Sequence, residues 1–299
     1  MSIIERAAEL LRSTPQTHPK PSTAIKGAGN LEQDLIARAA QHIGRRGASP
    51  GAKPAHPTGR TARTLRVDRG RLRQQSMIMP DGERSAIAES FRRIKRTILA
   101  NAADPKVGAP PSNLVLVTSA SPGEGKTFCA INLAISIALE VDRSVLLVDA
   151  DAAKPGVPQA LGLEADKGFM DVLLDCRIDL AEVMWKTDIP RLTLVPVGTV
   201  HKHATELLAS DAMHELLREM AERYHDRIII FDSPPLLAAS EAGVLASQMG
   251  QIVVVVEAGK TSEAALKDAL GRIDASRVAG LLLNKGEDLS LKYGYAGYG

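Results

Sequence analysis

Aromatic residues and cysteines are scarce in this chain of 299 residues. Phe, Trp and Tyr make up 3% of the sequence, against 44% for all hydrophobic residues, so a core must be built from aliphatic side chains. The two cysteines, Cys129 and Cys176, are far apart and form no Cys-x-x-Cys pair. This excludes a disulfide framework and is typical of a reducing compartment.

Long apolar runs are also missing. The sequence contains no stretch of about 18 uninterrupted apolar residues and therefore predicts no membrane-spanning helix. The N-terminal segment MSIIERAAELLRS carries acidic residues within its apolar stretch and does not resemble a signal peptide. We therefore expect a cytoplasmic protein.

Charge is unevenly distributed along the chain. Residues 1–80 contain fourteen Lys and Arg against five Asp and Glu, so this arm carries a net charge of +9, whereas the whole chain carries +2. Its segments 14–30 and 45–80 are rich in Pro, Gly, Ser and Arg, a composition that predicts disorder. Short helices are expected at residues 2–13 and 31–44. The domain division we predict is an arm over 1–80, a folded domain over 81–286 and a flexible tail over 287–299.

Beyond the arm, short apolar runs alternate with helical patterns. A helix is expected at 83–100, with its apolar residues on one face. The strands are expected at 114–118, 144–149, 192–197, 227–232, 251–256 and 278–284, and the intervening helices at 126–140, 204–224, 239–247 and 261–274. Nearly continuous apolar strands alternating with helices predict an α/β fold, with a mostly parallel central sheet covered by helices on both faces.

A phosphate-binding loop follows the first of these strands. The segment ASPGEGKT at 120–127 fits the pattern G-x-x-x-x-G-K-[ST] except that Ala120 occupies its first position. Glycines let backbone N–H groups turn toward phosphate oxygens, and the helix that follows adds its positive N-terminal end. In a P-loop NTPase, Lys126 reaches the β- and γ-phosphates and Thr127 ligates Mg²⁺. The residues expected to contact the nucleotide are Ser121, Pro122, Gly123, Glu124, Gly125, Lys126, Thr127, Phe128 and Asn284.

Carboxylates occur where two other strands end. Asp149 ends the run VLLVD and Asp151 follows it, whereas Asp232 ends the run RIIIFD. The carboxyl ends of parallel strands are where such sheets bind ligands, and Mg²⁺ bound to phosphate needs nearby carboxylates. We expect Thr127, Asp151 and Asp232 to hold the metal. Asn284, at the end of the last strand, serves either to bind adenine or to start a turn.

Motif by motif, residues 83–299 resemble the bacterial tyrosine kinases (BY-kinases), which are related to the MinD/ParA ATPases. SPGEGKT resembles their Walker A motif, VLLVDAD their Walker A′ motif and IIIFDSPP their Walker B motif. The likeness is greatest to the stand-alone autokinases associated with exosortase and exopolysaccharide gene clusters. MinD/ParA proteins carry a signature Lys where this chain has Ser121, which disfavours a partitioning ATPase.

Two further features extend the resemblance. Three of the four tyrosines, Tyr293, Tyr295 and Tyr298, lie in the last seven residues, and in this family such a cluster is the autophosphorylation substrate. The helix ESFRRIKRT resembles the E-x-x-R-x-x-R motif that holds subunits in a ring, with Glu89, Arg92 and Lys95 at its three positions. Two departures are that Lys95 replaces the second Arg and that Ala153 stands where the Walker A′ motif usually has Arg.

The resemblance implies a protein-tyrosine kinase that uses ATP and Mg²⁺ and regulates exopolysaccharide synthesis or export. A tyrosine from one subunit's tail would enter the site of the next, with Lys126, Asp149, Asp151 and Asp232 as the catalytic residues. Asp149 would orient the tyrosine hydroxyl or accept its proton. The activating partner in this family is a membrane polysaccharide co-polymerase, here expected to be a separate chain, with recruitment to the inner face of the membrane.

Two alternatives to this function are open. The first is an ATP-dependent switch of the MinD/ParA kind, which docks on a membrane partner without efficient kinase activity. The second is an ATPase anchored to DNA by the basic arm, which ranks last because the arm lacks interleaved aromatic residues. The arm suits an anionic membrane surface equally well, so no specific nucleic acid is expected.

Overall fold

The computed structural model describes residues 64–81, 85–104, 109–164, 166–175, 177–201 and 204–286. The short helices expected at 2–13 and 31–44, and the tyrosine tail at 287–299, lie outside these residues. Seven strands form one sheet in the order β3-β4-β2-β5-β1-β6-β7, and every neighbouring pair is parallel except β3 with β4. The strands are β1 (Leu114–Ser119), β2 (Ser144–Asp149), β3 (Trp185–Lys186), β4 (Leu192–Val195), β5 (Arg227–Asp232), β6 (Gln251–Glu257) and β7 (Val278–Asn284).

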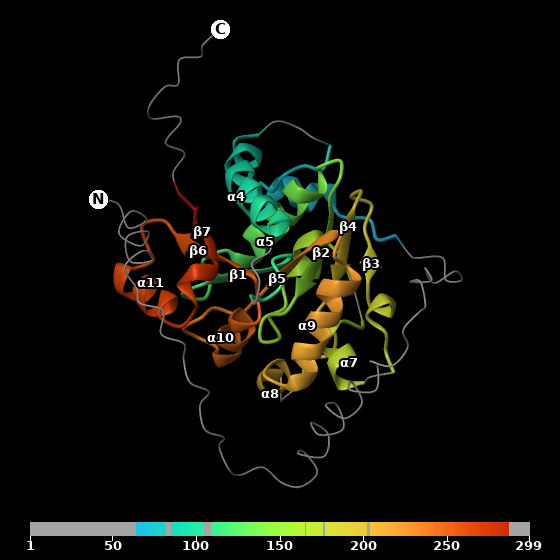
Figure 1. The fold of residues 1–299 in the computed structure, drawn as a ribbon. Helices are drawn as coiled ribbons and strands as arrows, with labels where there is room; N and C mark the ends of the chain where they lie inside the picture. Colours follow the sequence, from blue (N-terminus) through green and yellow to red (C-terminus); the bar gives the residue numbers. More distant parts are fainter. Residues whose placement is uncertain are drawn as a thin grey trace, which may run out of the picture.

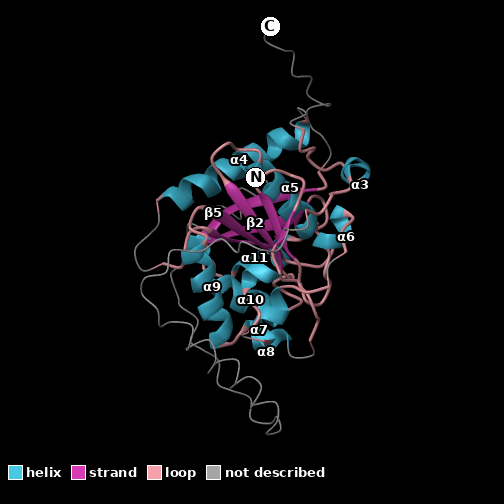
Figure 2. Ribbon diagram, turned by 90° about the vertical axis from the view of Figure 1, so that its right-hand side faces the viewer, coloured by secondary structure: helices cyan, strands magenta, loops and turns pink. Residues whose placement is uncertain are grey.

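Helices cover both faces of the sheet, as the nearly continuous apolar strands predict (Figures 1 and 2). Successive residues of β1 show why: Leu114 and Leu116 pack into the core on one face, whereas Val115 and Val117 pack into the core on the other. The first face carries α7 (Phe169–Leu174), α8 (Ala204–Leu208), α9 (Asp211–Arg223), α10 (Ser240–Ser247) and α11 (Glu263–Leu270); the second carries α3 (Arg69–Gln74), α4 (Ala86–Ala103), α5 (Lys126–Ala138) and α6 (Val157–Leu161). Two 3₁₀ turns, η1 (Leu180–Glu182) and η2 (Ala275–Arg277), complete the elements. The predicted α/β fold is confirmed.

Local chemistry adjusts the boundaries that periodicity predicts. The helix expected over 204–224 is two helices, because Ser210 accepts a hydrogen bond from Met213 N and thereby begins α9 as its N-cap. Strand β4 ends at Val195, because the next residue is Pro196, which has no N–H to donate to a neighbouring strand. The two-residue strand β3 was not expected.

Residues 64–80 depart from the disorder expected of the arm. Leu72 of α3 and Ile78 are fully buried in the core that contains α5, and Leu65 forms a parallel bridge with Thr187 beyond β3. Ile78 N donates a hydrogen bond of 2.7 Å to the buried side chain of Asn132 on α5. The folded unit therefore begins before residue 81. The composition of residues 64–80 did not predict this earlier start, because the segment is highly charged and only its few apolar residues pack in the core.

Candidate active site

The P-loop lies between β1 and α5, at the carboxyl edge of the sheet. Gly123 and Gly125 have φ angles of +86° and +94°, a left-handed conformation that glycine adopts without a Cβ clash. Helices α4, α9 and α11 each begin at a serine whose side chain accepts a backbone N–H, but α5 begins at Gly125 without a side-chain cap. The first N–H groups of α5 are therefore available to an anion, as a phosphate site requires.

Two carboxylates lie side by side next to this loop. Asp149 and Asp232 end the neighbouring strands β2 and β5 and are partners in the strand register. Both are fully buried, and burial is the main cause that raises their pKa values, to about 6 for Asp149 and well above the ordinary range for Asp232. The charge of Asp149 raises the pKa of Asp232 further. The pair therefore favours a proton or a cation over two bare negative charges.

Asp232 and Thr127 are brought together as the two motifs predict. Thr127 Oγ1 donates a hydrogen bond of 2.6 Å to Asp232 Oδ2, whereas Asp232 Oδ1 is buried without a hydrogen-bond partner. A buried, unpartnered carboxylate oxygen is costly unless a cation or donor joins it. Among the described residues, no three His, Cys, Asp or Glu side chains form a closed metal-binding group. Mg²⁺ on a nucleotide needs no such group, because phosphates and waters complete its shell, so these residues fit it.

Asp149, which we expected to orient the tyrosine hydroxyl, holds the backbone of its own loop. Its Oδ2 accepts backbone N–H groups from Gly156 and Val157, both at 3.0 Å, and its Oδ1 accepts that of Asp151 at 3.3 Å. The carboxylate is thus occupied in holding the loop that follows β2. Asp151 is 6% exposed, and burial raises its pKa while the nearby charge of Lys126 lowers it. The charge of Lys126 lowers the pKa of Asp232 as well, so both carboxylates lie near this lysine.

The other residues predicted to contact the nucleotide lie in different surroundings. Ser121 N donates to the side chain of Glu124 at 2.8 Å, so Glu124 folds back onto its own loop. Pro122 is exposed in the loop. Phe128 belongs to the first turn of α5 and is partly buried against the core that this helix covers. Asn284 Nδ2 donates to Glu124 O at 2.9 Å, which is a third use for this residue besides the two that were expected.

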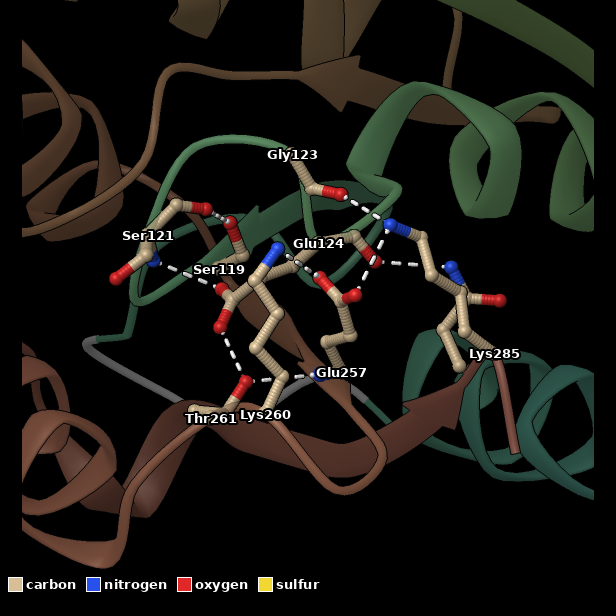
Figure 3. Close-up of polar contacts among 9 residues, drawn as sticks. Ser119, Ser121, Gly123, Glu124, Glu257, Lys260, Thr261 and Lys285 are labelled. Atoms are coloured by element: carbon tan, nitrogen blue, oxygen red, sulfur yellow. Dashed lines mark hydrogen bonds and ion pairs between the residues drawn. The ribbon is translucent and has the colours of Figure 1, made fainter. Parts of the chain in front are cut away.

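Sequence reasoning missed a polar network on one side of the P-loop (Figure 3). We call this the outer side: it contacts the ends of β6 and β7, whereas the inner side contacts Asp232. Glu124 is 3% exposed, and besides Ser121 N it accepts a short hydrogen bond from Thr261 Oγ1. Lys285 Nζ donates to Gly123 O at 2.7 Å and forms an ion pair of 3.3 Å with Glu257, whose other oxygen lies 3.4 Å from Lys260 Nζ. The only available signal was an acidic side chain inside a loop that binds anions.

The three residues expected at a subunit interface lie on α4 but do not share one environment. Glu89 and Arg92 form an exposed ion pair of 2.5 Å within the helix. Lys95 is 8% exposed; it donates to Ser136 O at 3.2 Å and forms a short ion pair with Glu140. Lys95 is therefore turned onto its own chain, whereas Glu89 and Arg92 remain on the open face, and the interface role of the three residues stays a prediction.

Comparison with known proteins supplies relatives for this arrangement. Residues 113–279 match the family described as an AAA domain. The chain is 34% identical over 238 residues to the tyrosine-protein kinase YwqD of Bacillus subtilis (strain 168), a match that covers 78% of this chain and 96% of that protein. It is 32% identical over 220 residues to the succinoglycan biosynthesis transport protein ExoP of Rhizobium meliloti (strain 1021), which covers 70% of this chain and 26% of ExoP.

One solved structure has a similar fold. The crystal structure of the chimerical protein CapA2B2 has a TM-score of 0.62 and 26% identity, covering 72% of this chain and 91% of that chain. The chain thus matches nearly all of YwqD but about a quarter of the much longer ExoP. Within the described residues, no helix is both long and apolar enough to cross a bilayer.

Proposed function

The chain belongs to the bacterial tyrosine-protein kinases, and on that premise we propose that it is an autokinase that transfers the γ-phosphate of ATP to Tyr293, Tyr295 and Tyr298. The observation that carries the proposal is the unpartnered oxygen of Asp232 beside Thr127 and an uncapped α5. Together they form a site that is incomplete without a cation and an anion. Mg²⁺–ATP supplies both.

The described residues have distinct parts in this transfer. Lys126 and the N–H groups at the start of α5 neutralise charge on the β- and γ-phosphates. Thr127, Asp151 and Asp232 would hold Mg²⁺, which when bound supplies positive charge to the transferring group. Asp149 fixes the loop that carries Asp151, and we propose that it also orients the tyrosine hydroxyl or accepts its proton. Most of the rate then comes from positioning and electrostatics.

We further propose that the tail is phosphorylated in trans within a ring of identical subunits. Glu89 and Arg92 lie on the exposed face of α4, where a neighbouring subunit can replace their mutual contact. Each phosphotyrosine adds about −1.5 to −2 charge, so several on adjacent tails would repel one another and loosen the ring.

The partner we propose is a separate membrane protein that governs polysaccharide chain length and activates the kinase. ExoP is by name a succinoglycan biosynthesis transport protein, and this chain matches only a quarter of it. The process under control would be exopolysaccharide synthesis or export. Residues 1–63 of the arm lie outside the described residues, and contact of the arm with anionic lipid stays a prediction.

Incubation with labelled ATP and Mg²⁺, followed by mapping of the phosphorylated residues, tests the proposal. Label is expected on the three tail tyrosines and absent from a Tyr→Phe triple variant that still binds ATP. ATP binding without any tyrosine label, with the membrane partner supplied, would overturn the kinase and favour the nucleotide-driven switch. For the trans mode, Lys126→Met protein with an intact tail is mixed with active protein that lacks residues 287–299. Label on the Lys126→Met tail is then expected, and its absence would indicate transfer in cis.

A further inference from the structure

The outer side of the P-loop is where its carbonyl groups are satisfied. A loop that directs N–H groups toward phosphate must turn the carbonyls of the same peptides away, and these carbonyls need donors of their own. Two consecutive residues supply them. Asn284 Nδ2 donates to Glu124 O at 2.9 Å. Lys285 Nζ donates to Gly123 O at 2.7 Å, as Figure 3 shows. Asn284 ends β7 and Lys285 follows it, so both donors are remote in sequence from the loop.

Steric contacts fix one of the two loop glycines but not the other. A Cβ at Gly125 would lie 2.0 Å from Asn284 Nδ2, so this peptide is confined by its neighbour. At Gly123 a Cβ would meet nothing within 4 Å. No neighbouring atom therefore confines Gly123 at its Cβ position as Asn284 confines Gly125. The contact that its carbonyl makes is the hydrogen bond from Lys285.

Lys285 is itself held in place. Its backbone has φ +57°, a left-handed conformation that turns the chain off β7. Its ammonium group lies between Gly123 O and Glu257 Oε1, the latter at 3.3 Å, and Ala258 N donates to Asn284 O at 2.9 Å. The end of β6, the end of β7 and the P-loop are thus joined through one side chain.

We propose that Lys285 is a positioning residue for nucleotide binding. Its ammonium group keeps the carbonyl of Gly123 turned outward, so that the peptide N–H that follows stays directed at the phosphates. Without it, the peptide at Gly123 rotates and places a carbonyl oxygen where phosphate oxygens bind, which repels them. Lys285 does not touch the phosphates in this scheme and acts through the loop. Because residue 287 begins the tyrosine tail, the residue that orients the loop also lies at the root of that tail.

The chain offers a matched control in Lys260. It forms an ion pair with the same Glu257 but makes no hydrogen bond with the P-loop in the described contacts. Lys285→Met and Lys260→Met therefore each remove one positive charge from Glu257, and only the first removes the donor to Gly123 O. Lys285→Arg retains both the charge and a donor. Met keeps the Cβ at the left-handed position, so the backbone cost is unchanged.

Affinity for a fluorescent ATP analogue with Mg²⁺ is the primary measurement. Lys285→Met is expected to bind about tenfold more weakly, the scale of one hydrogen bond from a charged group. Lys260→Met is expected to match the unsubstituted protein, and Lys285→Arg to recover to within about threefold. In kinase assays the loss should raise KM for ATP more than it lowers kcat, since the chemical groups are intact. The melting temperature confirms folding, and Lys285→Ala, which also lacks a donor, replaces Lys285→Met if the latter does not fold.

Two results would overturn the inference. One is unchanged ATP affinity in folded Lys285→Met protein. The other is an equal loss in Lys285→Met and Lys260→Met, which would show that only the charge next to Glu257 matters. The inference rests on the proposed function only for the site it serves, and the two fail separately. Unsubstituted protein that binds ATP but labels no tyrosine would refute the kinase, while the ratio of affinities would still decide the role of Lys285.

Discussion

Carboxylates on the two sides of the P-loop have opposite environments. On the inner side, Asp149 and Asp232 are buried next to each other, their pKa values are raised, and one oxygen of Asp232 has no partner. On the outer side, Glu124 accepts hydrogen bonds from Ser121 N and Thr261, and Glu257 lies between two lysines. Burial acts to raise the pKa of Glu257, but hydrogen bonds from Lys285 and Lys260 lower it overall.

This difference distinguishes carboxylates that can bind a ligand from carboxylates that stabilise the loop. An acid that has all its partners within the chain stabilises the structure as it stands, whereas an acid short of partners is satisfied only when a ligand arrives. Asp232 is thus ready to bind a cation, whereas Glu124 and Glu257 keep the loop in shape whether or not nucleotide is present. Substitutions at Lys126, Asp232, Glu124 and Asp149 test this contrast, and two on α4 test the proposed assembly.

The largest effect is expected from Lys126→Met. Removal of the lysine takes away charge that the phosphates meet during transfer, and phosphoryl transfer should fall about 10²- to 10³-fold. Labelling of the tail tyrosines at saturating ATP measures it. Lys267→Met, an exposed change on α11, is the control and should leave the rate unaltered. A loss below about tenfold would place the main charge stabilisation elsewhere.

Asp232→Asn and Glu124→Gln make the contrast between the two sides sharper. Both replace a buried carboxyl group by an amide of nearly the same shape. Glu124→Gln should lower the free energy of unfolding by about 1–3 kcal/mol, because it disturbs a satisfied acceptor. Asp232→Asn should leave the nucleotide-free protein as stable or more stable, and abolish the rise in melting temperature that Mg²⁺–ATP produces. Thermal unfolding with and without Mg²⁺–ATP distinguishes them, and equal destabilisation in both variants would contradict the contrast.

The dependence of stability on pH is the next test. The pKa of Asp149 is raised to about 6 in the folded chain, so folding favours its protonated form. Its contribution is complete below the unfolded pKa near 4 and is lost as pH rises through 6, an effect of about 3 kcal/mol. Asp149→Asn should remove this slope between pH 4 and 6 in nucleotide-free protein. Parallel curves for the two proteins, from denaturant titrations at each pH, would show that Asp149 does not titrate there.

The smallest effect is expected at α4. Arg92→Met breaks an exposed ion pair and should change the free energy of unfolding by at most about 1 kcal/mol. Its expected consequence is loss of assembly, read from the mass of the complex in solution. Lys95→Met removes a buried ammonium group from Ser136 O and Glu140 and should alter stability more than assembly. A larger effect of Lys95→Met on assembly than on stability would indicate that Lys95 lies at the interface.

The fold and the inner side of the site could be predicted from the sequence because their signals are local. A P-loop pattern follows a strand, and carboxylates at the ends of parallel strands must meet at one edge of the sheet. Thr127 and Asp232 are in contact for this reason, although they are 105 residues apart. Periodicity of apolar residues likewise located six of the seven strands.

The outer network could not be predicted in the same way. Thr261 and Lys285 lie 137 and 162 residues from their P-loop partners, and a polar residue after a strand is ordinarily solvated. Lys95 did leave a signal, because it lies four residues after Phe91 and three before Ile98, on the buried face of the helix. Resemblance to the E-x-x-R-x-x-R motif outweighed that spacing. Asn132, a buried amide on an apolar helix, similarly indicated a polar partner, which is Ile78 N.

The bridge between Leu65 and Thr187 bears on how the protein can be shortened. Strand β3 is only two residues long and antiparallel, and Leu65 pairs along the chain that continues from it. Edges of sheets left open invite other chains to add strands. A truncation at residue 81, where the charged arm looks dispensable, would open this edge and expose the apolar surface that Leu72 and Ile78 cover. Such a fragment is expected to aggregate, whereas one that begins at residue 64 keeps its edge closed.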